Sequence, residues 1–167
     1  MQFWALAYGV TTIFQQRPVA VIFWENSFYS IPASTFNKNE FDNNDWQSVI
    51  QKGLSFIYAE KPKTADGLKQ LLANIQEHKL APHHQIDLYK PLKPYFAYLI
   101  PYQLDISEII ENNAKIKLDI ERFLVKTKTN LKDHIYFPLY SKYQNSILIF
   151  DHNGNLKSYV TVPPRER

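Results

Sequence analysis

The sequence predicts an α+β domain with a mainly antiparallel sheet, in which two β-hairpins bracket helices and the end of a hydrophobic helix comes first. β-Branched and aromatic runs near both ends of the chain indicate the hairpins, and apolar residues at helical spacing between them indicate the helices. The chain has 167 residues, 45% of them hydrophobic and 21% charged, so it is long enough to bury a core. We expect a single domain over residues 17–167.

Residues 1–16 are predicted to be the end of a transmembrane or N-terminal hydrophobic helix. Their first part, MQFWALAYGVTTIF, is apolar and uncharged, but a spanning helix needs about 20 apolar residues. In one interpretation these are the last turns of a membrane helix, with Trp4 and Tyr8 at the membrane–water boundary and Arg17-Pro18 at the exit. In the other, they form a buried N-terminal helix of a soluble domain. The residues alone leave both open.

The first hairpin is predicted at residues 19–31. Residues 19–24 are β-branched and aromatic, and a strand-like alternation resumes at residues 28–31 after the polar break Glu25-Asn26-Ser27. Pro32 should end the second strand, because proline has no N–H to donate to a ladder.

Helical and extended patterns follow each other in the middle of the chain. Trp46, Val49 and Ile50 predict a short helix that Gly53 closes, and residues 54–59 predict a strand. Thr64 is placed to cap the next helix. The apolar face of that helix is expected to consist of Leu68, Leu71, Leu72 and Ile75.

The longest helix is expected at residues 105–126, with Ser107 and Glu108 at its start. Before it, the proline-containing residues 78–94 predict an irregular connection, and the aromatic residues 95–102 predict an extended segment. The core-facing stripe of the long helix is predicted to be Ile109, Ile110, Ile116, Ile120, Phe123 and Leu124.

The last third of the chain is predicted to be all-β. Strands are expected at residues 135–140, 146–150 and 156–162, and Asn153-Gly154 suits positive φ in the turn between the last two. Asp151 could also open a calcium loop, but alternating acidic ligands are missing and the twelfth position is Val162, so we interpret the segment as a hairpin turn.

Composition excludes several classes of function. The net charge is only +3, and Lys126, Lys128 and Lys132 form the one short basic stretch, which we interpret as a solvated helix face rather than a nucleic-acid site. The chain has no cysteine, which excludes disulfides, a thiolate nucleophile and Cys-ligated metals.

Histidines form the one cluster of potential metal ligands. His78, His83 and His84 lie near Pro82 in a predicted loop without an acidic ligand nearby, so we expect an exposed loop and no metal. The sequence holds no G-x-S-x-G, P-loop or dinucleotide fingerprint and only four glycines. We therefore expect a protein that is not an enzyme and has no cofactor.

Residues 8–23 read YGVTTIFQQRPVAVIF. This segment resembles the membrane exit of the type IV pilin accessory proteins, in which a Tyr-Gly pair ends a hydrophobic helix and an Arg-Pro-Val precedes an apolar strand and a hairpin. The family commonly continues with Val-Asp-Arg-Phe, where this chain has Glu25-Asn26-Ser27-Phe28, so a role for that acidic–basic pair does not carry over. The matching positions are Tyr8, Gly9, Arg17, Pro18 and Val19, with weaker likeness at residues 54–72 (including Pro62), at Pro101-Tyr102 and at residues 138–156.

The resemblance implies an accessory, chaperone-like protein of type IV pilus biogenesis. Such a protein is held in the inner membrane, has its folded domain in the periplasm, and binds or stabilises its cognate major pilin. The family's N-terminal transmembrane helices are missing here, so we expect this sequence to begin late in the last of them. The family supplies no catalytic residues to carry over.

The pilin contact is expected to form by strand addition at a sheet edge or by packing against an aromatic surface. For every candidate residue the alternative is ordinary core packing. Two other functions stay open: a soluble, non-enzymatic binding domain unrelated to pili, and an envelope-modifying enzyme. The candidate contact residues are Phe28, Tyr29, Tyr95, Tyr98 and Tyr102.

Overall fold

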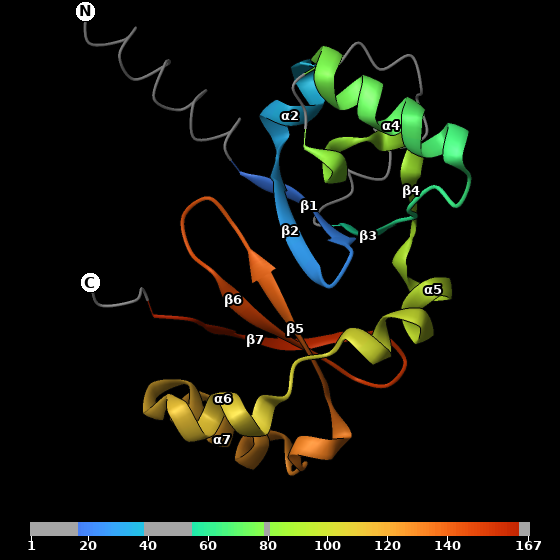
Figure 1. Ribbon diagram of the computed structural model, residues 1–167. Helices are drawn as coiled ribbons and strands as arrows, with labels where there is room; N and C mark the ends of the chain where they lie inside the picture. Colours follow the sequence, from blue (N-terminus) through green and yellow to red (C-terminus); the bar gives the residue numbers. More distant parts are fainter. Residues whose placement is uncertain (1–16, 39–54, 79–80, 164–167) are drawn as a thin grey trace, which may run out of the picture.

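The computed structural model describes residues 17–38, 55–78 and 81–163 (Figure 1). The predictions for residues 1–16 and for the short helix ending at Gly53 lie outside these residues. Within them the chain forms helices and one seven-stranded sheet, which confirms the α+β class.

The strands lie in the order β4-β3-β1-β2-β5-β6-β7. The sheet therefore has an N-terminal half, β4 to β2, and a C-terminal half, β5 to β7, which meet where β2 pairs with β5. The strands are β1 (Pro18–Trp24), β2 (Ser27–Pro32), β3 (Ser55–Ala59), β4 (Tyr89–Pro91), β5 (Ile135–Tyr140), β6 (Ser146–Phe150) and β7 (Leu156–Thr161).

The sheet is mixed, and the prediction of a mainly antiparallel sheet was wrong on this point. The pairs β1–β2, β3–β4, β5–β6 and β6–β7 are antiparallel. However, β1 pairs parallel with β3, and β2 pairs parallel with β5. Both parallel pairs involve strands that are joined through long connections rather than tight turns, which allows the chain to cross over before it returns to the sheet.

The first hairpin forms as predicted. β1 is buried along all of its length except Pro18, because it has a neighbouring strand on each edge and side chains packed on both faces. Its β-branched and aromatic residues suit such a central position. Glu25 in the turn adopts a left-handed φ of 57°.

The helices lie on both faces of this sheet (Figure 1). α5 covers one face of the sheet. On the opposite face, α4 covers the N-terminal half, and α6 together with α7 covers the C-terminal half. The helices are α2 (Ala33–Lys38), α4 (Ala65–His78), α5 (Leu92–Leu99), α6 (Ile106–Asn112) and α7 (Ala114–Thr127), and short 3-10 turns lie at Pro82–His84, Ile86–Leu88, Ile100–Tyr102 and Leu131–Asp133.

The core has three clusters, because strand alternation gives the sheet two faces and the face opposite α5 holds two of them. The α5 cluster is the most aromatic and joins the two halves of the sheet, since Phe23 of β1 packs edge-to-face on Phe137 of β5 with ring centroids 5.6 Å apart. Its buried members are Val21, Phe23, Phe28, Leu92, Phe96, Leu99, Ile135, Phe137, Leu148 and Phe150. The other two are built around Ile22, Ile57 and Leu71, and around Ile116, Ile120 and Ile149.

The prediction of an extended segment at residues 95–102 was wrong. This stretch belongs to α5 and the following 3-10 turn. Tyr and Phe favour strands, but Leu92, Phe96 and Leu99 recur at helical spacing, and all three are buried against the sheet. Burial of this apolar face outweighs the local preference for a strand.

The predicted long helix at residues 105–126 is two helices. Asn113 lies between them with φ −142° and ψ 99°, and its side chain accepts a hydrogen bond from the backbone N–H of Ile116 at 3.0 Å. An N-cap of this kind starts a new helix rather than continuing the old one. The predicted apolar stripe is confirmed, because all six of its residues pack in the cluster under α6 and α7.

The α4 prediction is confirmed at its start and corrected on its face. Thr64 Oγ1 accepts a hydrogen bond from the N–H of Gly67 at 3.1 Å, as expected of a cap. Leu71 is buried and Ile75 packs against the core, but Leu72 is 59% exposed.

The turn between β6 and β7 forms as predicted. Gly154 adopts φ +77°, and its N–H donates to the carbonyl of Asp151 at 3.0 Å. The turn packs against α5 so closely that a Cβ on Gly154 would lie 2.7 Å from Cγ of Phe96. Both the backbone conformation and the available space therefore require glycine here.

Candidate functional site

Four tyrosines line a cleft at the end of the sheet where the β1–β2 turn lies. Tyr58 comes from β3, Tyr95 and Tyr98 from α5, and Tyr102 from the following 3-10 turn. We call this the tyrosine cleft; its volume is about 690 Å³. Its floor includes Phe23, and its rim is charged, with Glu25, Glu60, Lys61 and Lys63.

The tyrosines face outward because of the helical period of α5. Leu92, Phe96 and Leu99 are buried, so Tyr95 and Tyr98, three residues apart, lie on the remaining surface of the helix. Tyr98 is 68% exposed. A tyrosine ring offers apolar area together with a hydroxyl at low conformational cost, which suits a surface that binds another protein.

The rings are ordered by stacking. Tyr58 and Tyr95 are nearly parallel, with centroids 5.0 Å apart and an interplanar angle of 15°. Tyr98 lies 6.3 Å from Tyr95 in a tilted arrangement, and Tyr102 lies 6.4 Å from Phe23. A ligand in this cleft would therefore meet a preformed aromatic wall.

The rim charges are paired with one another. Glu60 forms an ion pair with Lys90 and a second with Lys63 at 3.5 Å, and the hydrogen bond from Lys90 holds the pKa of Glu60 below its usual value. Lys90 also lies 5.4 Å above the ring of Tyr95. Burial, with the Glu60 charge as a smaller contribution, raises the pKa of Tyr58. Tyr58 is thus a neutral hydrogen-bonding group at neutral pH.

The structure brings together Tyr95, Tyr98 and Tyr102, which sequence reasoning selected. It places the other two selected residues elsewhere. Phe28 has no exposed surface and packs in the α5 cluster, while Tyr29 is half-buried and packs in the cluster under α4. Sequence reasoning missed Tyr58, because the predicted strand did not reveal which face its alternate residues take.

Three residues of the segment that resembles the pilin accessory family lie at the opposite end of β1, namely Arg17, Pro18 and Val19. Tyr8 and Gly9 are outside the described residues. The carbonyl of Arg17 accepts a hydrogen bond from the N–H of Ala33 at 3.0 Å, Pro18 is exposed, and Val19 is buried in β1. Arg17 thus directly precedes the central strand, and Pro18-Val19 begins it.

The histidine segment is folded rather than an exposed loop. His83 and His84 are half-buried in a 3-10 turn, with ring centroids 4.5 Å apart. The ring of His83 stacks on Tyr29 at 4.3 Å. Burial, followed by the neighbouring His84, lowers the pKa of His83 to about 4. No group of three His, Cys, Asp or Glu side chains suited to a metal occurs in the part of the chain that the structure describes.

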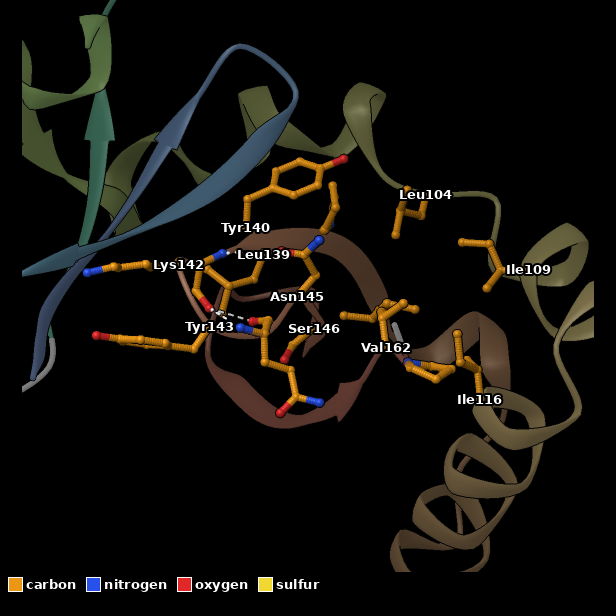
Figure 2. Close-up of a pocket in the computed structure, with 15 residues that line it drawn as sticks. Leu104, Ile109, Ile116, Leu139, Tyr140, Lys142, Tyr143, Asn145, Ser146 and Val162 are labelled. Atoms are coloured by element: carbon orange, nitrogen blue, oxygen red, sulfur yellow. Dashed lines mark hydrogen bonds between the residues drawn. The ribbon is translucent and has the colours of Figure 1, made fainter. Parts of the chain in front are cut away.

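A second cavity, also about 690 Å³, lies between α6, the end of β7 and the loop that joins β5 to β6 (Figure 2). Leu104, Ile109 and Ile116 form an apolar wall, and the loop with Lys142 and Tyr143 forms the opposite side. Among the described residues that line it, none is acidic, so its chemistry is that of an amphipathic groove.

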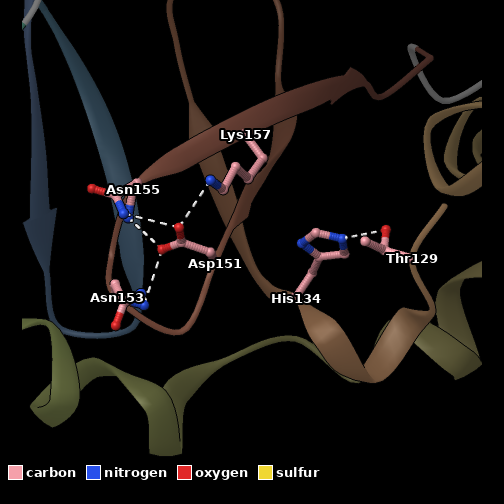
Figure 3. A network of polar contacts seen from close by, with 6 residues as sticks. All are labelled: Thr129, His134, Asp151, Asn153, Asn155 and Lys157. Carbon is pink, nitrogen blue, oxygen red and sulfur yellow. Dashed lines mark hydrogen bonds and ion pairs between the residues drawn. The ribbon is translucent and has the colours of Figure 1, made fainter. Parts of the chain in front are cut away.

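Asp151 is saturated with hydrogen bonds inside the β6–β7 turn (Figure 3). Its carboxylate accepts from the side chain and backbone N–H of Asn155 and from the N–H of Asn153, and pairs with Lys157 at 3.0 Å. These contacts, with the Asn155 side chain foremost, hold the pKa of Asp151 far below its usual value. The carboxylate therefore acts as a turn cap, in agreement with the interpretation as a hairpin.

No protein-family model, no curated protein and no solved structure matches this chain. Among the helices of residues 17–38, 55–78 and 81–163, none is long and apolar enough to cross a membrane.

Proposed function

We propose that this chain is an accessory, chaperone-like protein of type IV pilus biogenesis that binds and stabilises its cognate major pilin at the inner membrane. The likeness of residues 8–23 to the membrane exit of the pilin accessory proteins supports this function. The domain then lies in the periplasm and acts by binding, without catalysis, metal or cofactor.

The tyrosine cleft is the surface to which we assign the pilin contact, and its exposed aromatic wall is the observation that carries the proposal. Aromatic side chains that are held in place before binding lose little entropy on contact, and such residues dominate the binding energy of many interfaces. The cleft lies beside the Glu25 turn, at the end of β1 remote from Arg17. A pilin head that projects from the membrane can reach this end without displacing the anchor.

Co-purification of the membrane-embedded protein with its neighbouring pilin tests the assignment. Tyr98→Ala should lower pilin recovery about 5- to 30-fold, which corresponds to roughly 1–2 kcal/mol for an anchoring aromatic residue. Tyr159→Ala is the matched control, because Tyr159 is 63% exposed, close to the 68% of Tyr98, but lies on β7 outside the cleft.

Equal pilin recovery with the unchanged protein, Tyr98→Ala and Tyr159→Ala would refute the role of the tyrosine cleft. Unchanged pilin levels and piliation after deletion of the gene would refute the chaperone function itself. A divergent pilin serves as the specificity control and should not be recovered.

A further inference from the structure

The loop between β5 and β6, residues 141–145, lies at the end of the sheet where β1 begins. β1 starts opposite Pro32, the last residue of β2, and β2 runs parallel to β5 with Phe28 opposite Leu139. Continued in this register, the loop after β5 lies beside the end of β2 and thus near the point where Arg17 leads into the sheet. Figure 1 shows the orange loop close to the start of the blue strand β1.

The composition of this loop is that of a membrane interface. Tyr143 is 74% exposed, and Tyr140 directly before the loop is 45% exposed. Lys142 lies between them, with Nζ 5.3 Å from the centre of the Tyr143 ring. Residues 140–145 read YSKYQN and carry no acidic side chain. Tyrosine rings favour the headgroup region, and lysine reaches from it toward phosphate.

The loop is held in shape by its own hydrogen bonds. Ser141 Oγ donates to the carbonyl of Gln144 at 2.5 Å and accepts from the N–H of Gln144 at 3.0 Å. The carbonyl of Asn145 accepts from the N–H of Val162 at 3.0 Å, which ties the loop to the end of β7. Lys142 and Tyr143 are therefore presented outward by a preformed turn (Figure 2), so docking costs little ordering entropy.

We infer that the β5–β6 loop docks on the bilayer surface, with anionic phospholipid headgroups as the partner of Lys142 and the interfacial layer as the environment of Tyr143. The inference rests on the proposed function, because it takes residues 1–16 as the end of a membrane helix that leads through Arg17 into β1. A tether at Arg17 holds the loop at high effective concentration next to the surface. Docking at this second point orients the domain and directs the tyrosine cleft away from the bilayer.

Site-directed fluorescence on the membrane-embedded protein, in vesicles of phosphatidylethanolamine and phosphatidylglycerol, tests this orientation. None of the 167 residues is a cysteine, so Gln144→Cys and Asn153→Cys each add one labelling site to the domain without removing Lys142 or Tyr143. Asn153 is the matched control, because both residues are exposed, but Asn153 follows the end of β6, whereas Gln144 precedes its start. Quenching of an environment-sensitive label by headgroup-nitroxide lipid reports its distance from the bilayer.

The label at position 144 should be blue-shifted and quenched at least severalfold more than the label at position 153. In a protein that carries Gln144→Cys, adding Lys142→Glu should reduce this quenching in vesicles with phosphatidylglycerol, whereas Lys142→Arg should preserve it. Equal quenching at both positions in protein that floats with the vesicles would overturn the docking while leaving the anchor in place. Protein that does not float with vesicles would overturn the anchor, and the docking with it; pilin co-purification remains a separate readout of the tyrosine cleft.

Discussion

Substitution of Gly154 by alanine should destabilise the domain, for two reasons that add. Gly154 adopts φ +77°, a conformation that costs an L-residue about 1–2 kcal/mol. The new Cβ would also lie 2.7 Å from Cγ and 3.0 Å from Cδ2 of Phe96, and forcing a methyl group into a packed site costs about 1–3 kcal/mol. The lower entropy of the unfolded alanine chain offsets about 0.4–1 kcal/mol.

The net loss in the free energy of unfolding should therefore be about 2–3 kcal/mol, near the middle of the range that these terms allow. Urea unfolding followed by far-ultraviolet circular dichroism measures this loss. Gly154→Asn separates the two causes, because asparagine tolerates the left-handed conformation but still carries the Cβ. Gly154→Asn should therefore lower the free energy of unfolding, but by less than Gly154→Ala does.

The steric part can be isolated in a Phe96→Ala background. There only the Cβ of residue 96, at 3.0 Å, remains close to the new methyl group. The cost of Gly154→Ala should fall by about 1–2 kcal/mol, a coupling typical of residues in contact. An equal cost in both backgrounds, or a loss below about 1 kcal/mol in the original one, would refute the reasoning.

Three further predictions concern single polar side chains. The pKa of His83 is about 4 in the folded protein and 6.5 in the unfolded chain, so its contribution to stability is present above pH 6.5 and declines as the pH falls toward 4. Because this half-buried ring is partly screened by solvent, we expect the decline to be about 1 kcal/mol. Urea titrations should therefore show that the stability of His83→Gln depends less on pH, and an unchanged pH dependence would contradict this. Asp151→Asn should lower the free energy of unfolding by about 1 kcal/mol at neutral pH, because the turn hydrogen bonds become weaker. Since the pKa of Asp151 is lowered in the folded protein, the difference in stability between the two proteins should shrink as acid protonates the carboxylate. A difference that does not change with pH would show that the charge of Asp151 does not stabilise the turn. Asn113→Ala should lower stability by about 1 kcal/mol through loss of the α7 cap, and Asn112→Ala, the exposed control one residue earlier, should cost clearly less in the same urea assay.

Local patterns in the sequence determined most elements. The β-branched run of β1, the Thr64 cap and the β6–β7 turn each depend on interactions within a few residues, so the chain itself reveals them. The same holds for the apolar stripe under α6 and α7, whose period is visible in the sequence. The break at Asn113 was missed because a cap inside a continuous apolar stripe does not interrupt its period.

The candidate site was predictable only in part. The aromatic residues 95–102 were predicted to contain contact residues, but they were interpreted as extended. That interpretation missed the helical period, which turns Leu92, Phe96 and Leu99 inward and Tyr98 outward. Tyr58 lies more than thirty residues earlier, and its place beside Tyr95 follows from the packing of α5 against β3. No local pattern carries that information.

By itself, the sequence determined the class of fold, the β1–β2 hairpin, the β6–β7 turn and three of the four tyrosines of the cleft, because these follow from short-range propensity and composition. Only the tertiary structure decided that β3 pairs parallel with β1 and β5 parallel with β2, that Phe28 is buried in the core, and that the tyrosines meet in one cleft. Each of these features depends on which surfaces, distant in the sequence, pack against one another, and this packing is determined by interactions throughout the chain.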